Sequence, residues 1–122
     1  MLFVLSDELI FPHPSLASGE GFLALGGDLS PERLLLAYRF GIFPWYNPGD
    51  PILWWSPDPR LVLFPEEVKV SKSMRPYFNK DIFQWTWNNC FAEVMEACGQ
   101  VPRPGQSGDT WISGEMIDAY VR

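Results

Sequence analysis

A helical period of apolar positions runs through the stretch PERLLLAYRF, residues 31–40. Ser30 precedes it as an N-cap, and Pro31 suits the first helical position, where its missing N–H would have had no partner. Gly41 ends the pattern, and Ile42 stands where a glycine-terminated helix makes its closing hydrophobic contact. We therefore predict a helix over residues 31–40.

Shorter patterns predict strands and a turn. Residues 82–87 alternate between two sets of side chains with the period of two that is typical of a strand. Two apolar runs, residues 52–55 and 61–64, are also predicted as strands, the second of them buried. Residues 19–28, GEGFLALGGD, are predicted as a glycine-bearing turn that leads into the first helix.

Two further helices are predicted near the C-terminal end of the chain. The stretch NNCFAEVMEACG places apolar side chains at i, i+1, i+4, i+5 and i+8 from Cys90, with an asparagine as cap and Gly99 as stop. A loop over residues 99–110 follows, and Ser113 caps a last helix. Strands and helices in this order predict an α+β fold. The apolar face of the last helix consists of Met116, Ile117, Tyr120 and Val121.

Five prolines stiffen residues 42–60, IFPWYNPGDPILWWSPDPR. Each proline fixes its own φ and pushes the preceding residue toward extended geometry, so no helix is expected there. We place a domain boundary near Arg60. It separates a small N-terminal domain, residues 1–60, from a second domain, residues 61–122.

The composition is that of an aromatic-rich globular protein with an excess of acids. Of 122 residues, 47% are hydrophobic and 16% aromatic, and the formal net charge is −6. The molecule as a whole is therefore not predicted to bind nucleic acid through its net charge. Residues 69–80 differ, because they contain bases and no acid, and residues 71–79 within them are predicted as a basic helix or turn. The bases are Lys69, Lys72, Arg75 and Lys80.

No leader, membrane span or metal site is predicted. The N-terminal apolar run has five residues and acids follow it at once, unlike a signal peptide, and no run approaches the roughly 20 apolar residues of a bilayer-spanning helix. Cys90 and Cys98 would lie about 12 Å apart along one helix as core-facing thiols, too far for a disulfide. With reduced cysteines and His13 as the single histidine, in a surface loop, we expect a cytoplasmic protein without a zinc or iron site.

Nucleophilic and phosphate-loop chemistry have no support in these residues. A catalytic triad is not available, because the single histidine lies between two prolines. Gly26 and Gly27 lack the Lys-Ser/Thr pair that follows a phosphate loop, so a turn is expected there.

Four aromatic residues on the proline-stiffened backbone invite more attention: Trp45, Tyr46, Trp54 and Trp55. Rigid aromatic platforms stack on bases or sugars and lose little entropy on binding. From the residues alone, filling a small core explains them equally well. Because neighbouring side chains of a strand point to opposite faces, one of Trp54 and Trp55 is expected in the N-terminal core and the other at the cleft between the domains.

Longer stretches resemble a known family. Residues 21–65, GFLALGGDLSPERLLLAYRFGIFPWYNPGDPILWWSPDPRLVLFP, resemble the signature of the bacterial leucyl/phenylalanyl-tRNA–protein transferases almost without interruption. The pattern continues in order and spacing with VSKSM at 70–74, CFAEVMEAC at 90–98, TWIS at 110–113 and AY at 119–120. The resemblance covers essentially the whole chain.

The resemblance implies an aminoacyltransferase. Such an enzyme moves leucine or phenylalanine from aminoacyl-tRNA to the α-amine of a protein that begins with Arg or Lys, which marks that protein for N-end rule degradation. The acceptor amine attacks the ester carbonyl, a base removes a proton, and hydrogen-bond donors stabilise the oxyanion. The resemblance implies no cofactor, metal or membrane. It also implies that the second domain is the first, incomplete part of an acetyltransferase-like (GNAT) domain.

Site residues follow from the resemblance position by position. Two tryptophans match family positions near the terminal adenosine and the acceptor, and two tyrosines match positions in the same aminoacyl-tRNA and acceptor cleft. These four are Trp45, Trp111, Tyr38 and Tyr120. The family's basic tRNA-binding region is matched by Lys72, Arg75 and Lys80. Lys69 departs from the histidine of many members and adds charge to this patch.

Length is the larger departure from the family. Members continue well beyond position 122, and the acidic and amide residues assigned to activating the amine lie in that part. We therefore expect the catalytic residues outside these 122 residues, no transfer by them alone, and exposed apolar surface where strands are lacking. One alternative is a non-catalytic module that binds the tRNA end or dimerises. Another is an acyl-CoA-dependent acetyltransferase, for which no glycine-rich pyrophosphate loop stands in these residues.

Overall fold

The computed structural model describes residues 2–105 and 110–122 and divides into two compact units. The first unit combines Met1–Asp58 with Phe91–Arg122, and the second is Pro59–Cys90. Helices and a mixed sheet make the chain an α+β protein, as predicted. The domain division near Arg60 and the GNAT-like character of the second domain stay predictions.

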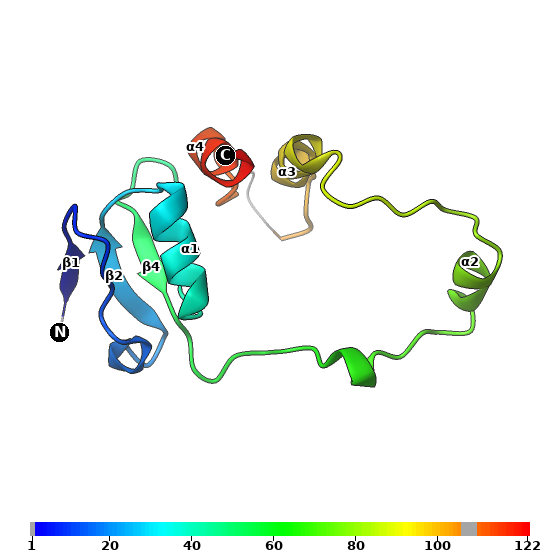
Figure 1. Ribbon diagram of the computed structural model, residues 1–122, viewed down its shortest axis with the longest axis horizontal. Coiled ribbons are helices and arrows are strands. Elements are labelled where there is room, and N and C mark those ends of the chain that lie inside the picture. The colour runs from blue at the N-terminus through cyan, green and yellow to red at the C-terminus, as the bar shows by residue number, and fades with distance from the viewer. Residues whose placement is uncertain (1, 106–109) are drawn as a thin grey trace. The chain divides into compact units, whose positions relative to one another are not determined.

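One four-stranded sheet forms the centre of the first unit, in the order β1-β2-β4-β3 (Figure 1). β1 (Phe3–Leu5) runs parallel to β2 (Phe22–Gly26), and β4 (Leu53–Trp55) is antiparallel to both β2 and β3 (Phe43–Pro44). The strand predicted at residues 52–55 is confirmed as β4.

The turn predicted over residues 19–28 is wrong for its middle part, because residues 22–26 are β2. Glycines at both ends suggested a turn, whereas the apolar run between them pairs with β1 on one side and β4 on the other. Leu23 and Ala24 are buried by this pairing, and the two glycines that end the run, Gly26 and Gly27, have positive φ and reverse the chain toward the helix.

The helix predicted over residues 31–40 is confirmed as α1 (Pro31–Arg39). The Ser30 side chain accepts a hydrogen bond from the backbone N–H of Arg33, and Gly41 follows the helix with φ of +69°. The N–H of Ile42 reaches back to the carbonyl of Ala37 at 2.9 Å, which closes a Schellman motif, and the Ile42 side chain is buried, as expected.

The core lies between the sheet and helix α1, which runs along one face of the sheet in Figure 1. The helix contributes Leu34 and Ala37, the sheet contributes β2 and β4 side chains, and the last helix adds Ala119. The buried cluster consists of Leu23, Ala24, Leu34, Ala37, Ile42, Trp54 and Ala119.

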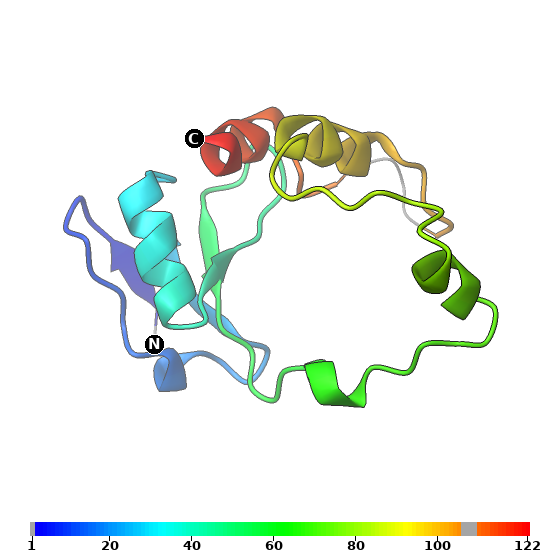
Figure 2. The same cartoon turned by 45° about the vertical axis from the view of Figure 1, so that its right-hand side comes forward.

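Two C-terminal helices complete the first unit, α3 (Phe91–Gln100) and α4 (Gly114–Val121), which lie side by side in Figures 1 and 2. Both were predicted, and Ser113 caps α4 by accepting from the N–H of Met116, although α3 runs through Gly99 instead of stopping there. The predicted loop 99–110 lies partly outside the described residues.

The two cysteines are free, as predicted, but only one lies on α3. Cys98 is half-buried, whereas Cys90 precedes the helix and is exposed, so the prediction of two core-facing thiols is wrong for Cys90. The helix begins one residue later than the apolar pattern suggested, and that places the Cys90 thiol in solvent.

The second unit contains a short 3-10 helix, η2 (Pro65–Glu67), and α2 (Arg75–Asn79), which confirms the predicted basic helix or turn. The strands predicted at residues 61–64 and 82–87 are wrong, because neither segment pairs with another strand among the described residues. A strand needs a neighbour for its backbone N–H and C=O groups, and an apolar pattern supplies none. Leu61 is 100% exposed and Trp87 86%.

No helix in the described part of the chain is long and apolar enough to span a membrane.

Candidate functional site

An aromatic hollow of about 330 Å³ opens on the first unit. Its walls come from α1, β3, the residue after β3, the segment before α4 and α4 itself. The four positions predicted for the aminoacyl-tRNA cleft are all found in its lining, although their roles stay predictions. The lining residues are Tyr38, Phe43, Pro44, Trp45, Trp111 and Tyr120.

Tyr38 on α1 and Tyr120 on α4 close one side of the hollow. Their hydroxyl oxygens lie 2.7 Å apart, and their rings meet edge to face with centroids 6.2 Å apart. Burial, with the hydrogen bond to Tyr38 as a second cause, raises the pKa of Tyr120 well above that of a free tyrosine. Its hydroxyl is therefore neutral at pH 7 and able to donate or accept a hydrogen bond.

Trp45 presents its indole beside the hollow, with 52% of the residue exposed. Its backbone is held on both sides, because its N–H donates to the carbonyl of Leu53 at 2.9 Å and its carbonyl accepts from the indole N–H of Trp55 at 2.7 Å. The rings of Trp45 and Trp55 also lie close, with centroids 5.9 Å apart. The exposed aromatic surface thus stands on an anchored backbone.

Tyr46 joins the end of β3 to α4. It is buried, and its hydroxyl donates to the carboxylate of Glu115 at 3.0 Å. Burial, followed by the neighbouring Glu115, raises the pKa of Tyr46 to about 12. The hydroxyl therefore keeps its proton at neutral pH and holds α4, with Tyr120, close to the strand that precedes Trp45.

Trp54 and Trp55 point to opposite faces of β4, as expected for adjacent residues in a strand. Trp54 is fully buried, packs edge to face on Phe11 and donates from its indole N–H to the carbonyl of Gly26 at 2.9 Å. Trp55 is half-buried against Phe22. The predicted split is confirmed for the core side, and the place of Trp55 at a cleft between domains stays a prediction.

Phe43 and Pro44 line the hollow but were not predicted as site residues. They form β3, a strand of two residues inside the segment that its prolines marked as irregular. Pairing with β4 creates this strand, so local patterns could not find it. The unbroken apolar run IFPW at residues 42–45 was the one signal in the sequence.

The three bases predicted to contact tRNA lie together along the chain in the second unit. Lys72 stands in the turn before α2, Arg75 is the first residue of that helix, and Lys80 follows its last residue. All three are exposed, which leaves their ammonium and guanidinium groups open to a phosphate. Their part in tRNA binding stays a prediction.

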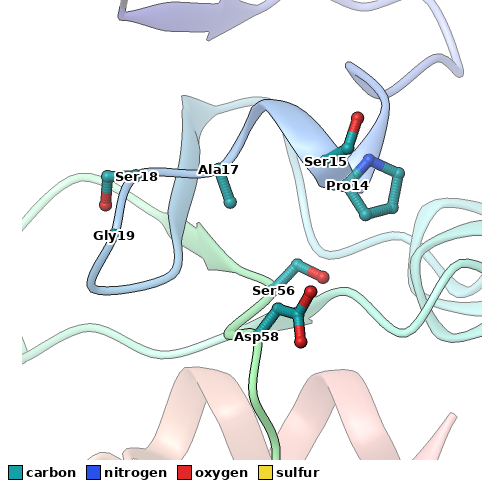
Figure 3. A pocket seen from close by; sticks show the side chains of 7 residues that line it. All are labelled: Pro14, Ser15, Ala17, Ser18, Gly19, Ser56 and Asp58. Atoms are coloured by element: carbon teal, nitrogen blue, oxygen red, sulfur yellow. The ribbon is translucent and has the colours of Figure 1, made fainter.

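A more polar hollow of about 510 Å³ lies elsewhere on the first unit, where Ser56 and Asp58 face the turn at residues 14–19 (Figure 3). Its hydroxyls already have partners in the fold. Ser15 Oγ lies 2.7 Å from His13 Nδ1, and Ser18 Oγ accepts from the N–H of Phe22. These two hydroxyls are therefore already engaged by the fold, and this hollow offers a ligand less than the aromatic surface of the first hollow does.

A metal-binding cluster is also lacking in residues 2–105 and 110–122, where no three His, Cys, Asp or Glu side chains gather closely enough to hold an ion.

Comparison with known protein families gives two matches that together cover most of the chain. The N-terminal domain model of leucyl/phenylalanyl-tRNA protein transferase matches residues 27–58, and the model of leucyl/phenylalanyl-tRNA protein transferase itself matches residues 62–122. The hollow draws its lining from both matched regions.

Curated relatives agree with these matches. The leucyl/phenylalanyl-tRNA–protein transferase of Flavobacterium johnsoniae is 59% identical over 119 residues, which is 98% of this chain and 56% of the relative. Those of Christiangramia forsetii and Cellvibrio japonicus are 54% and 58% identical, over 99% and 94% of this chain and 57% and 49% of the relatives. The chain therefore spans about half the length of the curated relatives it matches. On these matches, the chain belongs to the leucyl/phenylalanyl-tRNA–protein transferase family.

Proposed function

We propose that the chain acts in an aminoacyl transfer, in which leucine or phenylalanine moves from aminoacyl-tRNA to the N-terminal Arg or Lys of an acceptor protein. In this reaction an amide bond forms between the acceptor nitrogen and the carbonyl carbon. The ester bond to the terminal adenosine breaks, and the proton lost by the amine leaves with the ribose hydroxyl. The free cysteines are compatible with the cytoplasm as the place of this reaction.

One observation carries the proposal: two tryptophans and two tyrosines from distant parts of the chain line one hollow. Aromatic faces stack on a base or a sugar, and neutral tyrosine hydroxyls bond a ribose or an ester oxygen. We therefore assign the hollow to the aminoacylated adenosine at the tRNA 3′ end, with Trp45 and Trp111 as stacking surfaces.

Titration of a non-hydrolysable phenylalanyl-adenosine amide against residues 1–122 tests this assignment. Base–aromatic stacking is worth about 1–3 kcal/mol per base, so Trp45→Ala or Trp111→Ala is expected to weaken binding about 5-fold to 150-fold. Trp87→Ala is the matched control, since this tryptophan is 86% exposed and lies in the second unit. Equal affinities of the three variants would contradict the assignment.

The relatives are about twice as long as this chain, and we place the activation of the acceptor amine in the part that these 122 residues do not match. Residues 1–122 are then expected to bind the aminoacyl end without transferring it. Mixing them with radiolabelled leucyl-tRNA and a protein that begins with Arg checks this point. Label in the protein would show that the 122 residues suffice, whereas binding without label fits the proposal and also a non-catalytic binding module.

The basic residues of the second unit are assigned to the tRNA backbone. Phosphate contacts release counterions, so each contact adds to the salt dependence of binding. The affinity for intact tRNA falls as salt is added, and Lys72→Ala and Arg75→Ala are each expected to make the negative slope of log affinity against log salt shallower by about one. The same variants should bind the phosphate-free amide as the wild type does, which separates backbone contacts from the hollow.

A further inference from the structure

The second tryptophan of the WW pair has no place in the buried core cluster and does not line the hollow. Trp55 lies on the face of β4 opposite Trp54, between Phe22, with ring centroids 5.4 Å apart, and Trp45, with ring centroids 5.9 Å apart. Its indole N–H donates to the Trp45 carbonyl at 2.7 Å. Trp55 therefore contacts both the ring and the backbone of the residue that presents the exposed indole.

This hydrogen bond is one of three restraints on a short segment. The N–H of Trp45 donates to the carbonyl of Leu53, which lies on the same strand as Trp55. Two residues of β4 therefore hold the backbone of Trp45, Leu53 at its N–H and Trp55 at its carbonyl. Tyr46, the next residue, is fastened to Glu115 on α4. Because its N–H, its carbonyl and the following residue are all anchored, Trp45 has a fixed backbone from which a half-exposed ring projects.

We propose that Trp55 is a positioning residue, whose indole N–H holds the Trp45 carbonyl so that the Trp45 ring stands ready to stack on the aminoacylated adenosine. The inference rests on the proposed function of the hollow. A ring that is already ordered loses less conformational entropy when a ligand binds. Trp55 does so without touching the ligand, since it is not among the residues that line the hollow.

The test combines fluorine NMR with affinity, using the 122-residue chain labelled with 5-fluorotryptophan. The Trp45 and Trp54 resonances are assigned by their loss in Trp45→Phe and Trp54→Phe. In Trp55→Phe, which lacks the indole N–H, the Trp45 resonance should shift or broaden while that of Trp54 stays in place. The affinity for the phenylalanyl-adenosine amide should fall by about threefold to tenfold, which is the cost of ordering one freed side chain.

Phe22→Leu is the matched control, because it removes the ring contact on the far side of Trp55 and leaves the Trp55 N–H in place. It should disturb the Trp45 resonance and the affinity less than Trp55→Phe does. An unchanged Trp45 resonance in Trp55→Phe would overturn the inference, and so would equal effects of the two variants. If Trp45→Ala itself binds as the wild type does, the proposed function fails, and the fluorine spectrum still reports separately on the contact between Trp55 and Trp45.

Discussion

Tyr38 and Tyr120 share a hydrogen bond at 2.7 Å although 82 positions separate them in the sequence. The bond joins α1, which follows the first half of the sheet, to α4 at the other end of the described chain. Both rings face the same hollow, so the bond connects the two helices at the point where we expect the ligand.

A double-mutant cycle on this pair should show coupling. Tyr38→Phe and Tyr120→Phe each remove the shared bond, so the double variant is expected to lose less stability than the sum of the single losses. We expect a coupling energy of about 0.5–1 kcal/mol, at the low end because Tyr38 is more than half exposed. Urea denaturation of the four proteins measures it, and additive losses would contradict the role of this bond.

Alkaline pH should destabilise the first unit through Tyr46, whose pKa is raised to about 12 by burial and by Glu115. Below about pH 10 the hydroxyl is neutral in the folded and the unfolded chain, so its contribution to stability is complete. Between about pH 10 and 12 only the unfolded chain releases the proton, and the free energy of unfolding falls by on the order of 1 kcal/mol per pH unit. Tyr46→Phe should lose stability less steeply over this range in denaturant titrations, and parallel slopes would speak against the assignment.

Arg33 is expected to be the costliest polar residue to replace. Its side chain is fully buried and donates to the carbonyls of Ser6 and Glu8, and it forms an ion pair with Asp28 at 3.3 Å. Arg33→Met roughly keeps the volume of the side chain but leaves these acceptors without their donor. We therefore expect a loss of about 2–4 kcal/mol in the free energy of unfolding.

Asp28→Asn is the matched comparison for that variant. The Asp28 side chain is 50% exposed, and water replaces much of what the carboxylate supplies, so a loss of about 1 kcal/mol or less is expected. Equal losses for Asp28→Asn and Arg33→Met in urea denaturation would show that the ion pair, and not the backbone contacts, stabilises this part of the fold.

Gly21 and Gly49 form a matched pair for testing a close backbone contact. Both have φ near +90°, but a Cβ on Gly21 would stand 2.6 Å from Cα of Pro57, whereas one on Gly49 would meet nothing within 4 Å. Gly49→Ala should cost about 1 kcal/mol from backbone strain alone. Gly21→Ala should cost at least about 2 kcal/mol more, because the clash is with backbone. Equal melting temperatures of the two variants would refute the contact.

The second unit should be the first part of the chain to be digested. Its large apolar side chains are exposed, among them Phe64, Trp85 and Trp87, and the segments that carry them pair with no strand in the described residues. Brief chymotrypsin treatment followed by mass spectrometry is expected to cut within residues 59–90 and to leave residues 2–58 intact. Early cleavage after the exposed Phe40, next to α1, would contradict this order.

Local signals in the sequence were sufficient to predict α1, α3 and α4, although the asparagine cap and the Gly99 stop predicted for α3 were wrong, because that helix begins at Phe91 and ends at Gln100. Ser30 and Ser113 accept the capping bonds that their positions indicated, and Gly41 takes the positive φ that ends α1. The adjacent Trp54 and Trp55 point to opposite faces because a strand alternates its side chains, whatever surrounds it. Such features depend on a few neighbouring residues, and therefore a pattern is enough to predict them.

Strand pairing and the hollow depend on residues far apart in the chain. The sequence of residues 22–26 looked like a turn and became a strand between β1 and β4, while residues 61–64 and 82–87 looked like strands and found no partner. Family resemblance named Trp45, Trp111, Tyr38 and Tyr120, but only the folded chain, in which Ala119 of α4 joins the core cluster, places all four in the lining of one hollow.

The sequence by itself therefore determined the helices, the serine caps of α1 and α4, the alternation at the WW pair and the family. The tertiary structure decided which apolar runs become strands, that Phe43 and Pro44 join the hollow, and that Trp55 holds Trp45. The physical reason is the same in each case, because a backbone hydrogen bond within a helix has its partner four residues away. A strand, a pocket wall or an indole N–H finds its partner only when the chain has folded.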